Sequence, residues 1–389
     1  MQYMKSLFYI SLFTILLCLG SCTDNEEVSE AVKTRAAEFD VEFYQNTDDK
    51  TTDDSDNNTS GLNGVLDDYF IDGKSIIIIS QRGTSLSIDF NDYKIDSEGN
   101  QTENENLYKY VYYSNPSAKW ENLYNFQPSG NHALDWDYIG QDRLNGEYAL
   151  GALYYPIGYK VYNSVEADQS IYDNLLRSNI LGAWHRTNTL KTRLRFRFFH
   201  LMEAIRVTLL IPAWDSKDNS GFGTDAAKSA TLLSVIKEFD IDWSLDNSSE
   251  TPPNAQYTRN GVEPCDIRMF LESVDNEVKT IKLSEQTPSF PEEKENVRKA
   301  TFVVLFPPQQ PASNGPAMRF ILKTMGGQEK SYVWNTNNMY DNTLSSEGGR
   351  VNNLILYLPR KDHNAILIKA HILDWIEAES QFTVVPDDI

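Results

Sequence analysis

From about residue 75 onward, the chain is dominated by short, mainly apolar runs. These runs are rich in β-branched and aromatic residues and are separated by Gly, Pro, Asn and Asp, which is typical of strands joined by turns. The strand candidates are residues 75–80, 85–90, 107–113, 151–155, 193–199, 204–211, 300–306, 318–324, 353–358 and 365–372. Many short strands of this kind predict an all-β chain that folds as β-sandwiches.

Helical periodicity is weak along the whole sequence. Only residues 173–181 and 225–234 have a spacing compatible with short helices. The sequence has no internal repeat of fixed period. We therefore expect helices to contribute little to the fold.

The first residues have the pattern of an export signal. Lys5 supplies a positive charge, and the apolar run at 7–19 is shorter than the roughly 20 residues that span a bilayer. The run ends in LGSC at 19–22, which resembles the lipobox of bacterial lipoproteins. We expect residues 1–21 to be a signal peptide and the Cys22 thiol to carry lipid that anchors the protein in the outer membrane. The alternative is an ordinary secretory signal with a chance cysteine.

The segment 22–60 is polar and acidic, so it cannot bury enough apolar surface to order itself fully. One island at 38–44 interrupts it, where Phe39, Val41 and Phe43 alternate with polar residues as they do in a strand. We expect this segment to be a leader or linker that contains a single strand.

The chain has 389 residues, a formal net charge of −21 and a pI near 4.6. The part beyond the leader is too long for one comfortable core, which predicts an N-terminal β-sandwich domain at 61–215 and a C-terminal one at 216–389. The best boundary is the segment 215–224, which is rich in Gly, Asp and Ser. The acidic surface repels nucleic acid, which is therefore not an expected partner.

The chain has three cysteines. Cys18 leaves with the signal peptide and Cys22 carries the lipid, so only Cys265 remains in the folded part. The sequence therefore predicts no intrachain disulfide and no cysteine-based metal cage. We interpret Cys265 as a small core residue rather than a reactive thiol.

No segment has the spacing of a catalytic or metal-binding motif. The run DSDNN at 54–58 begins like a calcium-binding loop, but Thr59 stands where the loop needs Gly, and Val65 where it needs Glu. The histidines show no ligand spacing; they are His132, His185, His200, His363 and His371. Nucleotide-binding and zinc-protease motifs are missing from the sequence. We expect no enzyme activity, cofactor or metal site, and interpret His200 as a buried, hydrogen-bonded side chain.

Two segments leave alternatives open. Asp135-Trp136-Asp137 is either a sugar platform or, as we favour, a turn that buries Trp136. In the strand candidate at 193–199, Arg193, Arg195 and Arg197 alternate with apolar residues and give one basic face in an acidic protein. That face is either solvated or part of an intramolecular or intersubunit strip of ion pairs.

Several segments, taken in order, resemble the fimbrillin clan of Bacteroidales, the FimA/Mfa-like subunits of type V pili. They are Thr34-Arg35-Ala36 in the acidic leader, Tyr154-Tyr155-Pro156, Gln169, FRFFHLMEA at 196–204, GRVNNLIL at 349–356 and Asp374-Trp375. The order and spacing of all these segments carry the resemblance.

The resemblance implies two tandem transthyretin-like Greek-key β-sandwich domains after a lipoprotein signal peptide. It also implies cleavage after an Arg near the N-terminus, which in this sequence corresponds to Arg35 and Ala36. In the family, that cut removes a first strand and opens a groove for a strand of the next subunit. Strand addition of this kind pairs free backbone groups and covers apolar surface.

The sequence departs from a stalk subunit at its start. The segment between Cys22 and Arg35 is a poor strand, and the better strand, at 38–44, follows Arg35. Stalk, tip, anchor and accessory roles therefore stay open. Near the other end, QFTVV at 381–385 either enters a neighbour's groove or closes its own sheet.

We therefore expect a structural or adhesive subunit of a cell-surface fimbria, without catalysis. Its expected partners are other fimbrial subunits, outer-membrane lipid through Cys22, and surface glycans or proteins of host or bacterial cells. The alternative is a glycan-binding lipoprotein of a polysaccharide-uptake system, which exposed coplanar aromatic side chains would favour. A hydrolase on a β scaffold would need a deep cleft lined by convergent carboxylates.

Overall fold

The computed structural model describes residues 38–43, 62, 65–66, 70–80, 107–114, 126–128, 148–157, 163–187, 193–213, 217–242, 254–258, 261–282, 294–309, 316–335, 348–360 and 362–374. Within these ranges, regular structure consists of nineteen strands and one short helix, α4 (Tyr172–Arg177). The prediction of a nearly all-β chain is confirmed. The strand candidate at 85–90 lies outside the described residues.

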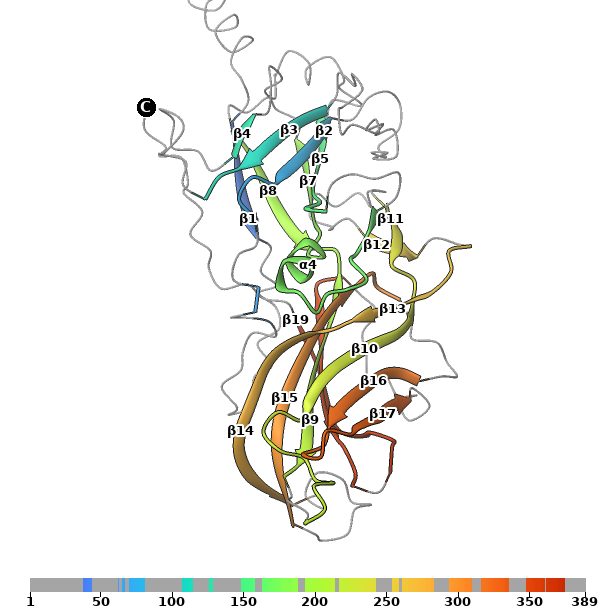
Figure 1. Ribbon diagram of the computed structural model, residues 1–389. Helices are drawn as coiled ribbons and strands as arrows, with labels where there is room; N and C mark the ends of the chain where they lie inside the picture. The colour runs from blue at the N-terminus through green and yellow to red at the C-terminus, as the bar shows by residue number, and fades with distance from the viewer. Residues whose placement is uncertain are drawn as a thin grey trace, which may run out of the picture.

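A seven-stranded sheet forms the upper part of the molecule in Figure 1. Its strands, in spatial order, are β1 (Glu38–Phe43), β8 (Arg193–His200), β7 (Leu181–Thr187), β5 (Tyr148–Tyr154), β2 (Ser75–Ser80), β3 (Leu107–Tyr112) and β4 (Phe126–Pro128). All neighbours in this sheet are antiparallel except β1 and β8, which are parallel.

Phe70 is the hub of the core on one face of this sheet. Its ring centroid lies 5.5 Å from that of Tyr112, 5.0 Å from Phe126, 4.9 Å from Tyr154 and 5.7 Å from Phe198. These rings come from β8 near one end of the strand order, β5 at its centre, and β3 and β4 at the other end. The sheet therefore curls around Phe70, with several rings in the edge-to-face arrangement that aromatic side chains favour.

The lower part contains two larger sheets. A five-stranded sheet has the order β14 (Phe270–Lys282), β15 (Lys294–Phe306), β9 (Glu203–Pro212), β18 (Arg350–Tyr357) and β19 (Ile366–Asp374). A four-stranded sheet has the order β13 (Cys265–Arg268), β10 (Ala227–Val235), β16 (Pro316–Lys323) and β17 (Glu329–Asn335). A small sheet of β12 (Asn254–Thr258), β11 (Glu238–Asp242) and β6 (Asn163–Ser164) completes the set.

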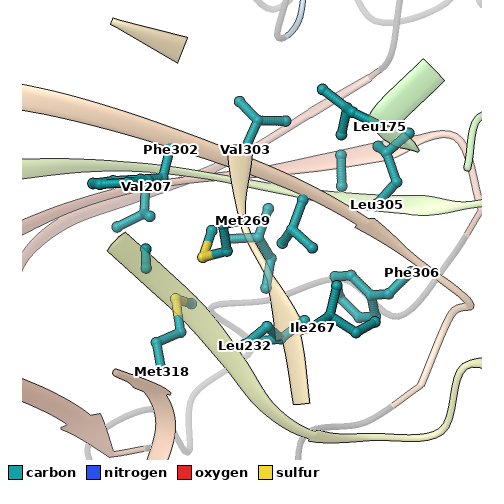
Figure 2. Packing of buried hydrophobic residues seen from close by; sticks show 14 of the residues in the cluster. Leu175, Val207, Leu232, Ile267, Met269, Phe302, Val303, Leu305, Phe306 and Met318 are labelled. Carbon is teal, nitrogen blue, oxygen red and sulfur yellow. The ribbon is translucent and has the colours of Figure 1, made fainter. Parts of the chain in front are cut away.

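The core of this lower part is formed by alternate apolar side chains of the two larger sheets. Val207 and Phe302 come from the five-stranded sheet and meet Leu232, Ile267 and Met318 of the four-stranded sheet (Figure 2). All five are almost completely buried. Burying each side chain of this kind contributes about 1.5–3 kcal/mol, so the contact between the sheets is a major source of stability.

The prediction of a second helix at 225–234 is wrong. The structure has β10 there, paired with β16 on one side and β13 on the other. Ala230 and Leu232 point into the core, and a register shift between Leu232 and Val235 accompanies a positive φ of 57° at Ser234. Tertiary pairing outweighs a weak local helical preference here.

The chain passes from the upper sheet to the lower one at Leu201 and Met202. β8 ends at His200 in the seven-stranded sheet, and β9 begins at Glu203 in the five-stranded sheet. The passage is buried, because Leu201 and Met202 are almost inaccessible to solvent. The division into domains at 215/216 stays a prediction, while the change of sheet lies earlier in the chain.

Candidate functional site

Several residues singled out in the sequence lie outside the described ranges: Cys22, Arg35, Ala36, Trp136 and the tail at 381–385. The structure does describe Tyr155, Gln169, His200 and the segment from Gly349, and it brings them to the junction between the upper and lower sheets. Figure 1 shows α4 at this junction, between the seven-stranded sheet and the sandwich.

Gln169 fastens the segment before α4 to the sandwich. Its side chain is fully buried; Nε2 donates to the carbonyl oxygen of Leu305 at 2.6 Å, and Oε1 accepts from the backbone N–H of Leu305 at 2.9 Å. The backbone continues the attachment, since Gln169 N–H donates to Arg268 and Arg268 N–H donates to Ala167. The side-chain amide thus hydrogen-bonds β15 at Leu305 in the two-way manner of a neighbouring strand.

His200 holds the segment after α4. Its Nδ1 lies 2.8 Å from Oδ1 of Asn179, and both side chains are buried. The backbone N–H of Leu201 donates to the carbonyl oxygen of Ile180 at 2.9 Å. The prediction of a buried, hydrogen-bonded His200 is confirmed.

Glu203 lies two residues beyond the passage and is 1% exposed. Its carboxyl group accepts a short hydrogen bond from the side-chain amide of Asn352 in β18. Burial raises the pKa of Glu203 well above its ordinary value, and this outweighs the hydrogen bonds from Asn352 and from the Gln309 backbone, which lower it. A buried carboxyl group therefore links the first residue of β9 to the neighbouring strand.

A pair of glycines completes the junction. A Cβ atom on Gly348 would lie 2.8 Å from the carbonyl oxygen of Leu201 and 3.1 Å from that of His200, which leaves no room for a side chain. Gly349 has a φ of +73°, a region that favours glycine, and its N–H donates to Met202 at 3.0 Å. This Gly-Gly turn lets β18 begin directly against the passage between the sheets.

The junction is a closed, internally bonded joint rather than a binding cleft. Gln169, His200 and Glu203 are buried, and each side chain makes at least one hydrogen bond to another side chain or to backbone. Leu153 and Trp184 of the seven-stranded sheet also belong to the same apolar cluster as the sandwich core. The arrangement fixes the two parts of the molecule to each other, and among the described residues of the junction no exposed nucleophile or acid–base pair is present. Sequence reasoning missed the role of Asn179, whose only signal is its place just after a short helix.

The sheet edges are the second candidate site. β1 and β4 are the end strands of the upper sheet, and β14 and β19 are the end strands of the five-stranded sheet. β14 is long, but a bulge between Asp275 and Lys279 interrupts its register. The exposed part of the strand also carries acidic residues. Bulges and charges hinder further strand pairing, which makes β14 a protected edge.

No group of three or more His, Cys, Asp or Glu side chains in the described ranges could hold a metal ion. In the same ranges, no helix is both long and apolar enough to cross a membrane.

No family model matches the chain, and no curated protein matches it. Solved structures do resemble it. A proposed cell adhesion protein from Bacteroides ovatus has 13% sequence identity, covers 89% of this chain and 99% of its own, and has a TM-score of 0.45.

Two fimbrial proteins from Porphyromonas gingivalis are also similar. The tip fimbrial protein Mfa3, with a C-terminal truncation, has 9% identity, covers 79% of this chain and 96% of its own, and has a TM-score of 0.32. The fimbrial anchor protein Mfa2 has 9% identity, covers 88% and 98%, and has a TM-score of 0.33. These neighbours are described as cell adhesion and fimbrial proteins.

Proposed function

We propose that this chain is a structural or adhesive subunit of a cell-surface fimbria, with no catalytic role. The observation that carries the proposal is that the first and last described strands, β1 and β19, both lie at sheet edges. An edge strand offers backbone groups that a strand of another subunit can pair with, which is how β-strand addition assembles polymers.

The proposal includes the finer features expected from the sequence. These are two transthyretin-like Greek-key domains, a lipid on Cys22 and attachment to the outer membrane before assembly. The buried joint supports this role, because a subunit that transmits force along a fibre benefits from domains held in one orientation.

A cut after Arg35 would leave β1 in the chain, since β1 begins at Glu38. Such a cut would not vacate the edge of β8. This supports a tip, anchor or accessory position over a stalk position that depends on removal of an N-terminal strand.

The glycan-binding alternative gains no specific support. The exposed large apolar side chains that the structure describes are Ile171, Tyr172, Val274, Val278 and Met325. Tyr172 is the one aromatic residue among them, and its ring is tilted by 46° against that of Phe270 at 5.5 Å. This geometry is not the flat platform on which a sugar ring stacks.

Fractionation of surface material tests the proposed function. We expect antibodies against the chain to label sheared surface fibres and to detect it in high-mass species together with other subunits. Cys22→Ala should leave precursor that takes up no labelled palmitate and does not reach the surface. Finding the wild-type chain only as a membrane-bound monomer would overturn the proposal.

Deletion of residues 381–389 tests whether the C-terminal tail makes the strand-addition contact with a neighbouring subunit. If the tail is a donor strand, the truncated chain keeps its melting temperature but leaves the polymers. If the tail closes its own sheet, the truncated chain has a lower melting temperature than the full chain. A tail of the same length with Phe382 and Val384 replaced by Ser is the matched control, because it removes the apolar side chains and keeps the backbone.

A further inference from the structure

Glu203 is a buried acidic residue at the start of β9, where it is 1% exposed. One carboxyl oxygen, Oε1, accepts a hydrogen bond from the side-chain amide of Asn352. The other oxygen, Oε2, is buried and makes no hydrogen bond of standard geometry with the described residues. A buried carboxylate is costly unless a cation or several hydrogen bonds compensate its charge. The geometry therefore favours the neutral acid over the anion.

The groups closest to Glu203 do not supply the missing compensation. The two groups that lower its pKa, the side-chain amide of Asn352 and the backbone N–H of Gln309, are both neutral, and burial outweighs them. Arg206 lies in the same strand, but it is paired with Glu272. The strand β9 itself therefore offers no free cation to Glu203.

The neighbouring elements carry four titratable side chains in this region. Arg350 starts β18, the strand beside β9, and His200 ends β8 just before the passage. Lys237 and Glu238 lie at the start of β11, and β15 has no titratable residue beside Glu203. None of these four groups contributes to the pKa shift of Glu203. An ionised Glu203 would therefore be a buried charge without a counterion in the described part of the chain.

Glu203 also lies at the point where the joint is tightest. It follows Met202, the residue whose carbonyl oxygen accepts from the Gly349 N–H at 3.0 Å. Gly348 has no room for a Cβ atom against the carbonyl oxygen of Leu201. The bond from Asn352 to Glu203 joins the same two segments, namely the start of β18 and the passage. Separation of these segments would bring water to the carboxyl group.

We propose that Glu203 is a proton-controlled latch of the joint between the seven-stranded sheet and the sandwich. The neutral acid keeps the start of β18 against the passage. Loss of the proton favours a state in which these two segments separate and water solvates the carboxylate, while both sheets stay folded. The latch makes the stiffness of the molecule depend on pH, and it operates whether or not the chain enters a fimbria.

The pH range of the opening follows from the two states of the joint. In the open joint the carboxyl group is hydrated and titrates near its ordinary pKa of 4.5, whereas the closed joint keeps the proton to higher pH. Below pH 4.5 both states carry the proton, so the opening does not depend on pH. Above it the open state releases the proton first, and the opening equilibrium rises by up to about tenfold per pH unit. The rise ends once the closed joint also ionises.

Hydrogen exchange of the full chain between pH 5 and 9 tests the latch. The amides of Gly349 and of the first residues of β18 report on the joint, because they are bonded to the passage and to β9. After correction for the intrinsic pH dependence of exchange, their protection in the wild type should fall by up to about tenfold per pH unit. The amides of β16 report on the sandwich and should keep their protection.

Glu203→Gln keeps the shape of the side chain and removes the ionisation, so it should hold the joint closed at every pH. Glu295→Gln is the matched control, because Glu295 belongs to the same five-stranded sheet but is paired with Arg360. This control should retain the pH dependence of the wild type. The proposal is wrong if Glu203→Gln has the same pH dependence as the wild type, or if β16 loses protection together with Gly349.

A second variant keeps the test decisive if Glu203→Gln does not fold. The amide of Asn352 lowers the pKa of Glu203 by binding the charged form. Asn352→Ala should therefore raise that pKa and extend the opening to higher pH, whereas a purely structural loss would lower protection equally at all pH values. Infrared spectra of the wild type at pH 6 should also contain the C=O band of a protonated carboxylic acid. Absence of this band would likewise rule out the latch.

Discussion

The seven-stranded sheet and the C-terminal sandwich solve the problem of core formation in different ways. The upper sheet curls around Phe70, so rings from four strands depend on one side chain. The sandwich instead brings two separate sheets together, and its contact is spread over many aliphatic and aromatic side chains. A core with one hub is sensitive to a single change, whereas a distributed core tolerates the loss of one member better. The joint at Gln169, His200 and Glu203 couples the two regions, so its strength determines whether they unfold together or separately.

The largest effect is expected from Phe70→Ala. Removing a buried Phe costs about 3–5 kcal/mol, and here the loss falls on the upper sheet. Hydrogen exchange should show lost protection in β5, β7 and β8 while β9 and β15 keep theirs. Phe320→Ala in β16 is the matched control, and it should affect the sandwich first. Equal loss of protection in both regions after either change would show that they unfold as one unit.

Gln169→Ala is expected to uncouple the two regions. The change leaves the buried N–H and C=O of Leu305 without partners, at about 1–3 kcal/mol for each group. Calorimetry should show the single transition broaden or split in two. Gln309→Ala is the control, because the Gln309 amide binds the backbone of Ile236 in a similar two-way manner but is only partly buried. A greater loss of stability with Gln309→Ala would contradict the assignment of Gln169 as the main fastening.

Glu203→Gln should change how stability depends on pH. Burial raises the native pKa of Glu203 above the ordinary value of 4.5. The folded chain therefore holds the proton at pH values where the unfolded chain has released it, so this group's contribution falls as the pH rises above 4.5. We expect Glu203→Gln to gain stability relative to wild type at pH 8, and to gain less at pH 4. Denaturation at the two pH values measures the difference; a pH-independent difference would argue against a raised pKa.

The smallest effects are expected from two ion pairs of unequal burial. Arg268 and Asp168 form a 3.0 Å pair with side chains 57% and 42% exposed, so Arg268→Ala should cost about 0–1 kcal/mol. Arg206 and Glu272 form a two-pronged pair with side chains 17% and 13% exposed. Arg206→Ala should cost more, about 1.5–3 kcal/mol, because it leaves a half-buried carboxylate without its cation. Thermal melts of the two variants at low and high salt measure both losses of stability. A larger loss for Arg268→Ala than for Arg206→Ala would contradict this comparison.

The sequence by itself determined the fold class and many of its elements. Short runs of β-branched and aromatic residues, bounded by turn residues, predicted strands that match β2, β8, β9 and β18 to within a few residues. β14 was missed, since FLESVDNEVKTIK at 270–282 is an edge strand whose exposed half carries charges instead of a regular apolar face. A single position, His200, was also interpreted correctly, because an imidazole inside an apolar strand is buried with the strand.

Only the tertiary structure decided the long-range partners. The segment at 227–235 is a strand because β13 and β16 lie on either side of it, and no local pattern carries that information. Gln169 and Leu305, or Glu203 and Asn352, meet across more than 130 residues, so their spacing in sequence could not pair them. The match of acidic positions in β1 to basic positions in β8 lies between these cases. Both charge patterns were visible in the sequence, but the parallel register that aligns them depends on the fold, which brings the two strands to the same edge.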